Sequence, residues 1–272
     1  PGPQRPRQQS PGLPPPGGST RIAPGPPAAP RSAAIGATDI FVGDEVLALA
    51  AAGGGATIGS DVARDFGLVL LEEIAVTLTG DRVLRFRIPD GRDVQSVVAA
   101  LTADPRIEGP QPNFVYRAQQ GGAARPAPPD LQYAPARIEL ADAHALATGA
   151  GVLVAVIDSG VDATHPDLAG AIEAEIDVSG SSNRNGQTAD PHGTAIAGIV
   201  GAREALTSVA PASNMLAVRA FATTGTGAAR SHTMALLKAM DWSVASGARV
   251  INMSFAGPKD PIMARALAAA HK

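Results

Sequence analysis

The sequence contains no cysteine among its 272 residues. Disulfide scaffolds, zinc sites with thiolate ligands and cysteine nucleophiles are therefore excluded. The absence of cysteine does not indicate whether the protein works in an oxidising or a reducing compartment. The sequence also has no long run of lysine or arginine, and its formal net charge is -3. Because this balance does not attract acidic polymers, we expect neither nucleic acid nor an anionic membrane surface as a partner.

Long apolar stretches are also missing. The longest candidate, Val46 to Ala52, is far shorter than the roughly 20 residues that a membrane-spanning helix needs. The chain starts at Pro1, and Lys272 falls within an apolar helical pattern, so we expect a piece of a longer protein. Any secretion signal would then lie upstream. Apolar residues make up 45% of the chain, which is enough for one large or two modest cores.

Composition divides the chain into four parts. Residues 1–35 are rich in proline and contain no acidic residue, which predicts a disordered linker. A PxxP ligand for a partner domain is the alternative for this stretch. Residues 36–119 are predicted to form a small domain, residues 120–130 an exposed connector rich in Gly, Ala and Pro, and residues 131–272 a second domain.

The small domain alternates between strand and helix patterns. Strands are predicted at 45–49 and 113–117, and a hairpin is predicted to join 74–78 to 84–88 through a two-residue turn at Gly80 and Asp81.

Two helices complete this pattern. One is predicted to start at a Ser60 cap and to end at Gly67, and the other to start at an Asp93 cap. The order βαββαβ, with both helices on one side of an antiparallel sheet, predicts a small α+β domain of the ferredoxin-like kind. The domain contains no histidine, so nothing in it indicates acid-base chemistry.

The pattern changes in the second domain. A helix is predicted from Ile138 through Ala147, and the apolar run 152–157 is typical of a strand buried on both faces. Further strands are predicted at 215–221 and 249–255, with helices at 192–200, 231–246 and from Pro261 onward. Strands that alternate with helices predict an α/β fold with a doubly wound parallel sheet. Ligands of such sheets bind beyond the carboxyl ends of the strands.

Two polar residues stand where such a sheet places its chemistry. Asp158 follows the apolar strand directly, and His192 opens an apolar helix. Alone, an aspartate after a strand is usually a turn former and a histidine at a helix start is usually a cap. Together they can supply a general base and its orienting partner, which activate a serine hydroxyl. His165 is instead predicted to have a turn role, and His232, beside a Ser231 cap, to be a solvated first-turn residue.

The segments around this pair resemble motifs of the subtilisin-like serine proteases (subtilases, peptidase S8). Residues 152–162, VLVAVIDSGVD, are similar to the aspartate motif of that family, and residues 190–198, DPHGTAIAG, are similar to its histidine motif. The resemblance runs from about residue 131 to the end, and further segments follow in the family's order: 209–211, 215–219 and 250–254. Residues 112–116, PNFVY, resemble the inhibitor I9-like prodomains of the family less distinctively.

This resemblance implies the precursor of a serine endopeptidase that acts on polypeptides through an Asp, His and Ser triad. Asp158 would orient His192, and His192 would be the base. Residues 36–119 would be a prodomain that acts as an intramolecular inhibitor, and the protein would be secreted or located in the cell envelope.

The resemblance also implies two edges that hold an extended substrate through backbone hydrogen bonds. The residues on these edges are Ser254, Phe255 and Ala256, and Gly225, Thr226 and Gly227. Ala256 stands where relatives commonly have glycine, so the preferred substrate side chain stays open.

The serine of the triad is missing from the sequence, which has no Gly-x-Ser-x-Gly and no Gly-Thr-Ser. We expect that truncation removed it together with the oxyanion asparagine, so that the chain as printed is inactive. The alternative is a catalytically inactive peptide-binding or inhibitor protein on a protease-like scaffold, and sequence downstream of Lys272 separates the two. The proposed chemistry needs no cofactor, and no residue pattern predicts a metal centre. Structural calcium occurs in the family, but the sequence does not identify ligands for it.

Overall fold

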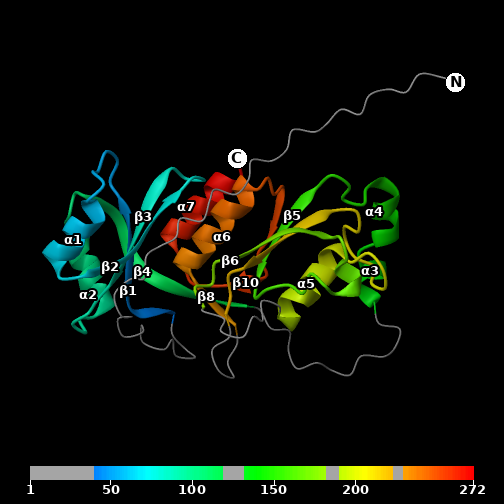
Figure 1. Ribbon diagram of the computed structural model, residues 1–272, viewed down its shortest axis with the longest axis horizontal. Coiled ribbons are helices and arrows are strands. Elements are labelled where there is room, and N and C mark those ends of the chain that lie inside the picture. Colours follow the sequence, from blue (N-terminus) through cyan, green and yellow to red (C-terminus); the bar gives the residue numbers. More distant parts are fainter. Residues whose placement is uncertain (1–39, 119–131, 182–189, 223–228) are drawn as a thin grey trace, which may run out of the picture. The chain divides into compact units, whose positions relative to one another are not determined.

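The structure is a computed structural model that describes residues 40–118, 132–181, 190–222 and 229–272 (Figure 1). The predicted linker and connector lie outside the described residues, and so do the predicted substrate-binding residues Gly225, Thr226 and Gly227. Within the described residues, no helix is both long and apolar enough to cross a bilayer.

The first part of the described chain builds an antiparallel sheet (Figure 1). Its elements are, in chain order, β1 (Phe41–Ala50), α1 (Ile58–Phe66), β2 (Val69–Val76), β3 (Asp81–Arg87), α2 (Val94–Leu101) and β4 (Ile107–Ala118). These strands lie side by side in the order β4, β1, β3, β2, and each pair is antiparallel.

Alternating residues of β1 give this sheet two apolar faces. Val46 and Ala48 pack with Val62 of α1 and Val97 of α2 in one core cluster. Leu47 and its alternating partners belong to a second cluster, which also contains residues of two later helices, α6 (Thr233–Ala245) and α7 (Pro261–Ala270). Since successive side chains of a strand point to opposite faces, the sheet is covered by helices on both sides.

In the first part of the chain, the helix ends agree with the local sequence signals at Gly67 and Asp93 but not at Ser60. Gly67 ends α1 in the left-handed conformation, with φ 64°, as the sequence predicted. The Asp93 carboxylate caps α2 by accepting a hydrogen bond from the Ser96 N–H at 2.9 Å, which is also as predicted. The Ser60 cap was wrong, because α1 already begins at Ile58, after Thr57.

The predicted two-residue turn was also wrong. Val76 pairs with Asp81, so residues 77–80 form the loop and Asp81 is already the first residue of β3. Gly80 has φ 75° and donates its N–H to the Val76 carbonyl at 2.9 Å, which closes this longer turn.

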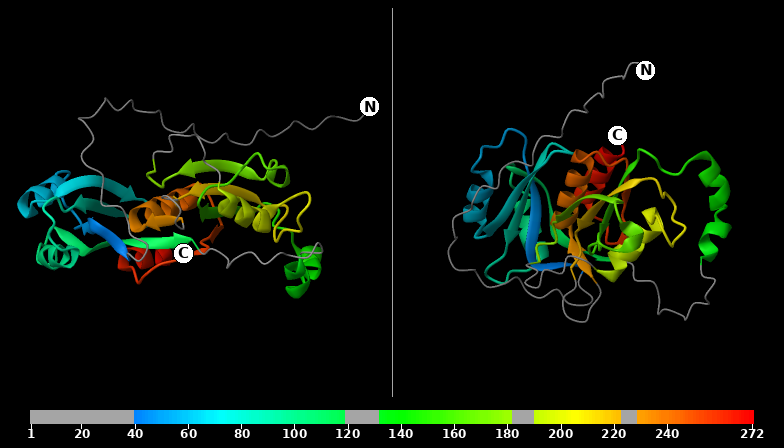
Figure 2. Two further views of the ribbon diagram at one scale, coloured as in Figure 1. Left: turned by 90° about the horizontal axis from the view of Figure 1, so that it is seen from below. Right: turned by 45° about the vertical axis from the view of Figure 1, so that its right-hand side comes forward.

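The second part of the chain contains a four-stranded parallel sheet (Figure 2). The strands lie in the order β6 (Ile172–Asp177), β7 (Asn214–Arg219), β5 (Leu153–Asp158) and β9 (Val250–Asn252). Val154 and Val156 of β5 pack in a cluster with Ala197 of α5 (Pro191–Gly201), whereas Ala155 and Ile157 pack in the cluster that contains α6 and α7. Helices therefore cover both faces, as in the doubly wound α/β arrangement that the sequence predicted.

Several details differ from the sequence prediction. The helix predicted from Ile138 to Ala147 is present as α4 (Leu140–Leu146), which starts two residues later because Glu139 has a left-handed backbone with φ 52°, and the preceding helix α3 (Tyr133–Arg137) was not predicted. The strand β6 was not predicted. The strand predicted at 249–255 divides into β9 and β10 (Phe255–Ala256), because the chain leaves the parallel sheet after Asn252.

The end of β4 joins the two parts of the chain. Val115 and Arg117 pair with His232 and Arg230 of β8 (Arg230–His232), and the pairing is antiparallel. On the other side, Arg117 and Ala118 pair with Ala256 and Phe255 of β10. The last residues of β4 therefore lie between β8 and β10, so backbone pairing crosses between the two domains predicted from the sequence.

Candidate active site

Asp158 is the last residue of β5, at the carboxyl edge of the parallel sheet, and it is only 2% exposed. Its Oδ1 accepts hydrogen bonds from the Ser159 N–H at 2.7 Å and from the Ser159 hydroxyl at 2.9 Å. A buried carboxylate requires such donors, because burial without them would favour the neutral form. The strand end and its turn thus hold a carboxylate in one fixed orientation.

His192 lies in the first turn of α5. The Asp190 side chain caps this helix by accepting a hydrogen bond from the His192 N–H at 2.9 Å, and Pro191 occupies the first turn. The His192 Nδ1 lies 2.7 Å from Asp158 Oδ1. Because an ionised carboxylate only accepts, Nδ1 carries the proton of this hydrogen bond and Nε2 is the basic nitrogen.

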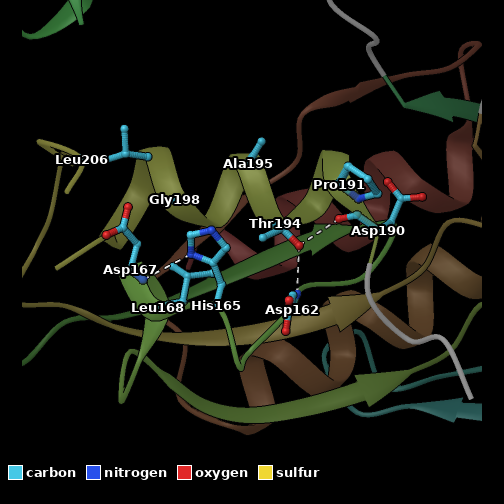
Figure 3. Close-up of a pocket in the computed structure, with 10 residues that line it drawn as sticks. All are labelled: Asp162, His165, Asp167, Leu168, Asp190, Pro191, Thr194, Ala195, Gly198 and Leu206. Atoms are coloured by element: carbon cyan, nitrogen blue, oxygen red, sulfur yellow. Dashed lines mark hydrogen bonds between the residues drawn. The ribbon is translucent and has the colours of Figure 1, made fainter. Parts of the chain in front are cut away.

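The turn after Asp158 and the start of α5 are held together closely. A Cβ at Gly193 would lie 2.2 Å from the Gly160 carbonyl oxygen, so only glycine fits there. The Thr194 hydroxyl donates to the Asp190 carbonyl at 2.9 Å and accepts from the Asp162 N–H at 2.9 Å (Figure 3). These contacts fix the distance between the two elements that supply Asp158 and His192.

A pocket of about 400 Å³ lies beside this start of α5 (Figure 3). Its lining includes Asp162, Asp190 and Thr194, but neither member of the hydrogen-bonded pair. His165 also lines it, and its Nδ1 accepts from the Asp167 N–H at 3.2 Å. His165 therefore stabilises a turn, in agreement with the sequence prediction. Within the described residues, no group of three or more His, Asp or Glu side chains is placed to hold a metal ion.

The structure brings some of the predicted substrate-binding residues to the same edge as Asp158. Val156 of β5 pairs with Asn252 of β9 in parallel, so Asp158, at the end of β5, and Ser254, two residues after β9, lie at the carboxyl ends of neighbouring strands. The Ser254 hydroxyl donates to Asn252 Oδ1 at 2.9 Å. Phe255 and Ala256 form β10, whose pairing edge is occupied by the end of β4.

The prediction that His232 is solvated was wrong. His232 itself, rather than Ser231, caps α6, because its Nδ1 accepts a hydrogen bond from the Ala235 N–H at 3.3 Å. Burial, together with the positive charge of Arg85, lowers the pKa of His232 to about 4, although Glu45 opposes this shift. The imidazole is therefore neutral near pH 7, which leaves Nδ1 able to accept. Sequence reasoning missed this because Glu45 and Arg85 come from the first part of the chain.

Sequence reasoning also missed the polar contacts that β4 makes with the second part. Asp260 was not singled out, yet it is 5% exposed and accepts from the Tyr116 hydroxyl at 3.0 Å. Its one available signal was its position before Pro261, which is typical of a helix cap.

The fold and this pair define a class of protein: an α/β domain with a buried aspartate and a helix-start histidine in hydrogen-bond contact beyond a parallel sheet. Residues 149–270 match the model of the subtilase family of peptidases. This segment of the chain is a member of the subtilase family, whose members are serine proteases.

Characterised relatives agree with this assignment. The chain is 33% identical over 197 residues to the thermophilic serine proteinase of Bacillus sp. (strain AK1), a match that covers 68% of this chain and 46% of that protein. It is 32% identical over 130 residues to thermitase of Thermoactinomyces vulgaris, covering 46% of this chain and 45% of that protein. The chain thus spans about half the length of the curated relatives it matches.

Solved structures show the same fold. Fervidolysin from Fervidobacterium pennivorans, a keratinolytic enzyme related to subtilisin, aligns with a TM-score of 0.66 over 86% of this chain and 39% of its own, at 19% identity. The epidermin leader peptide processing serine protease of Staphylococcus aureus aligns with a TM-score of 0.57 over 86% of this chain and 57% of its own, at 15% identity.

Proposed function

We propose that this chain is the precursor portion of a serine endopeptidase that hydrolyses polypeptides. The observation that carries the proposal is the 2.7 Å hydrogen bond between His192 Nδ1 and buried Asp158, within a segment of the subtilase family. In this proposal the serine nucleophile and the oxyanion asparagine come from residues outside the printed sequence, since the matches cover only 46% and 45% of the two relatives. By its family, the protein is secreted or located in the cell envelope.

The chemistry follows from the orientation of the imidazole. His192 Nε2 takes the proton of the serine hydroxyl as the serine oxygen adds to the peptide carbonyl carbon, and then passes that proton to the leaving amine. In the second half of the reaction, water takes the place of the serine. His192 accepts a proton from the water as its oxygen adds to the acyl-enzyme carbonyl, and then returns a proton to the serine oxygen, which releases the peptide acid. Asp158 stays ionised and stabilises the imidazolium that forms in each step.

The first part of the chain acts as a ferredoxin-like prodomain and intramolecular inhibitor in this proposal. The support is that β4 ends between β8 and β10, so residues 115–118 occupy the backbone edges that an extended substrate needs. A substrate strand and β4 cannot pair with the same edges at once.

Polar contacts hold the prodomain on helices α6 and α7. The Asn113 and Gln111 side-chain oxygens accept from the Met234 and Ile262 N–H groups, at 3.5 and 3.1 Å, in the first turns of the two helices. Such acceptors satisfy donors that a helix start leaves unpaired. The side chain of Asp241 accepts the Leu78 N–H at 2.7 Å.

Charged contacts add to this docking. Within the first part of the chain, Asn113 is held in place by donating to Glu45, which is 0% exposed and pairs with Arg85 at 2.6 Å. Burial alone would raise the pKa of Glu45, but the hydrogen bond and charge of Arg85 outweigh it, so the pKa lies below its ordinary value. Lys238 of α6 forms an ion pair with Glu72, and Arg265 of α7 forms one with Asp81 at 2.7 Å.

Residues 36–119, made as a separate protein, are expected to fold and to inhibit peptide hydrolysis by the full-length enzyme at about 1 μM or below. The reason for independent folding is that one core cluster lies wholly within residues 46–107. A matched control ends at residue 114, so that it keeps this core and loses the strand that enters the cleft. We expect it to fold and to inhibit at least about 100-fold more weakly.

Circular dichroism and inhibition assays on the two proteins test this directly. If the full-length protein hydrolyses peptides and residues 36–119 inhibit that hydrolysis, the alternative of an inactive peptide-binding protein is rejected. Equal inhibition by the two proteins, or none by either at large excess, would contradict the prodomain assignment. Absence of any hydrolysis by the full-length protein would contradict the endopeptidase assignment itself.

A further inference from the structure

The Tyr116 side chain lies in a polar-ended pocket of the second part of the chain. It is 6% exposed, and its ring meets the Phe255 ring edge-on at 5.8 Å between centroids. At its far end, the hydroxyl donates to Asp260 Oδ2 at 3.0 Å. Burial, and then the negative charge of Asp260, raises the pKa of Tyr116, so the phenol keeps the proton that it donates.

The acceptor at the end of this pocket does not depend on the prodomain for its position. Asp260 caps α7 by accepting the Met263 N–H at 3.0 Å on Oδ1, and it accepts the Thr233 hydroxyl at 2.7 Å on Oδ2. Both donors belong to the second part of the chain. Gln111 and Tyr116 supply the remaining hydrogen bonds. When β4 leaves, the carboxylate therefore stays in place and each oxygen loses one donor.

The wall beside the ring is shaped for an aromatic side chain. A Cβ at Gly257 would lie 2.2 Å from Tyr116 Cδ1 and 2.3 Å from its Cε1, so any other residue at position 257 would fill the space of the ring. Gly257 has no need of an unusual backbone angle, since its φ is not in the left-handed range. Its small size instead serves the close approach of the ring.

Backbone pairing alone does not choose between peptides. Tyr116 pairs with Ser231 of β8, and its neighbour Arg117 pairs with Ala256 of β10, through main-chain groups that every extended peptide has. Selection must come from pockets that receive alternate side chains.

We propose that Phe255, Gly257 and Asp260 form a tyrosine-selective subsite of the substrate cleft, in which Asp260 accepts the phenol hydroxyl and which Tyr116 occupies in the precursor. This inference rests on the proposed function. A substrate tyrosine replaces the donor that Asp260 loses with β4, whereas phenylalanine fills the ring space and leaves the buried carboxylate short of a donor. Sites built to bind a hydroxyl discriminate strongly against analogues that lack it.

The test uses the full-length enzyme and peptides that differ at one position. Tyr, Phe or Ala is placed in turn at each position on the amino side of the cleaved bond, and kcat/KM is measured. At one position we expect Tyr to exceed Phe at least about tenfold, which is the effect of a hydrogen bond to a charged acceptor. A Tyr to Phe ratio near one at every position would overturn the subsite and leave the endopeptidase assignment intact.

Three variants test whether the preference for Tyr over Phe peptides arises in this pocket. Asp260→Ser keeps a side chain able to cap α7 but is too short to reach the phenol, so the Tyr to Phe ratio is expected to fall below about threefold. Lys259→Ala removes an exposed charge next to it and should keep the ratio. Gly257→Ala should instead lower Tyr and Phe peptides together relative to Ala peptides. A preference that survives both Asp260→Ser and Gly257→Ala would place the selection elsewhere.

A second measurement judges the subsite without hydrolysis. In the 272-residue chain, Tyr116→Phe is expected to make amide exchange of the Ala118 N–H, which donates to the Ala229 carbonyl at 3.1 Å, about tenfold faster. An Ala118 N–H that exchanges at the same rate in the Tyr116→Phe variant and in the unchanged chain would overturn the subsite. Faster exchange in a chain whose full-length protein hydrolyses no peptide would keep the binding of the tyrosine hydroxyl by Asp260 and reject the endopeptidase.

Discussion

Replacement of His192 by alanine is expected to lower the kcat of the full-length enzyme roughly 10³- to 10⁶-fold, with KM within a few-fold of its original value. The physical reason is that the imidazole accepts the serine proton in the transition state and contributes little to binding of the peptide. Steady-state kinetics on one peptide substrate, with circular dichroism to verify folding, make the measurement.

A histidine elsewhere provides the control for this change. His271 is exposed at the end of α7, so His271→Ala should leave kcat unchanged. If His192→Ala keeps more than about a tenth of the activity, another group is the base and the proposed mechanism is wrong.

The Asp158→Asn variant is expected to lower kcat by roughly 10⁴-fold while the fold persists. The reason is the tautomer of His192. An asparagine amide can donate to Nδ1, and the imidazole proton then moves to Nε2, the nitrogen that has to accept the serine proton. Asp158 is buried and the replacement has the same shape, so the packing around it should change little.

Kinetics and thermal unfolding of Asp158→Asn should be compared with Asp177→Asn. Asp177 also ends a strand of the parallel sheet, at the end of β6, but it pairs with Arg219 at 2.7 Å and not with a histidine. We expect Asp177→Asn to keep near-normal kcat. Similar losses in both variants would show that the carboxyl edge is sensitive in general and that Asp158 has no special role.

Local sequence signals predicted the parts of the fold that depend on neighbours along the chain. The apolar run 152–157 identified a strand buried on both faces, and Asp158 therefore had to emerge at its carboxyl end. Gly67 and Asp93 marked a helix end and a helix start because each interacts with backbone groups within a few residues. The hydrogen bond between Asp158 and His192 followed from family motifs rather than from spacing alone.

Features that depend on distant residues were not predicted. His232 looks solvated in sequence, yet Arg85 and Glu45 come within electrostatic reach from β3 and β1, far away along the chain. The pairing of β4 with β8 and β10 joins segments more than a hundred positions apart, and no periodicity reports such partners. Asp260 was not singled out, because its contact with Tyr116 exists only after the two parts dock.

The central claim is that Asp158 and His192 activate a serine from outside the printed sequence. Labelling with a fluorophosphonate, which reacts with an activated serine, followed by mass spectrometry of the modified peptide, tests it most directly. In the processed full-length protein we predict one labelled serine that lies beyond residue 272 and is no longer labelled in the His192→Ala variant. The 272-residue chain by itself should stay unlabelled. Label on a serine within residues 1–272, or label that persists without His192, would contradict the account.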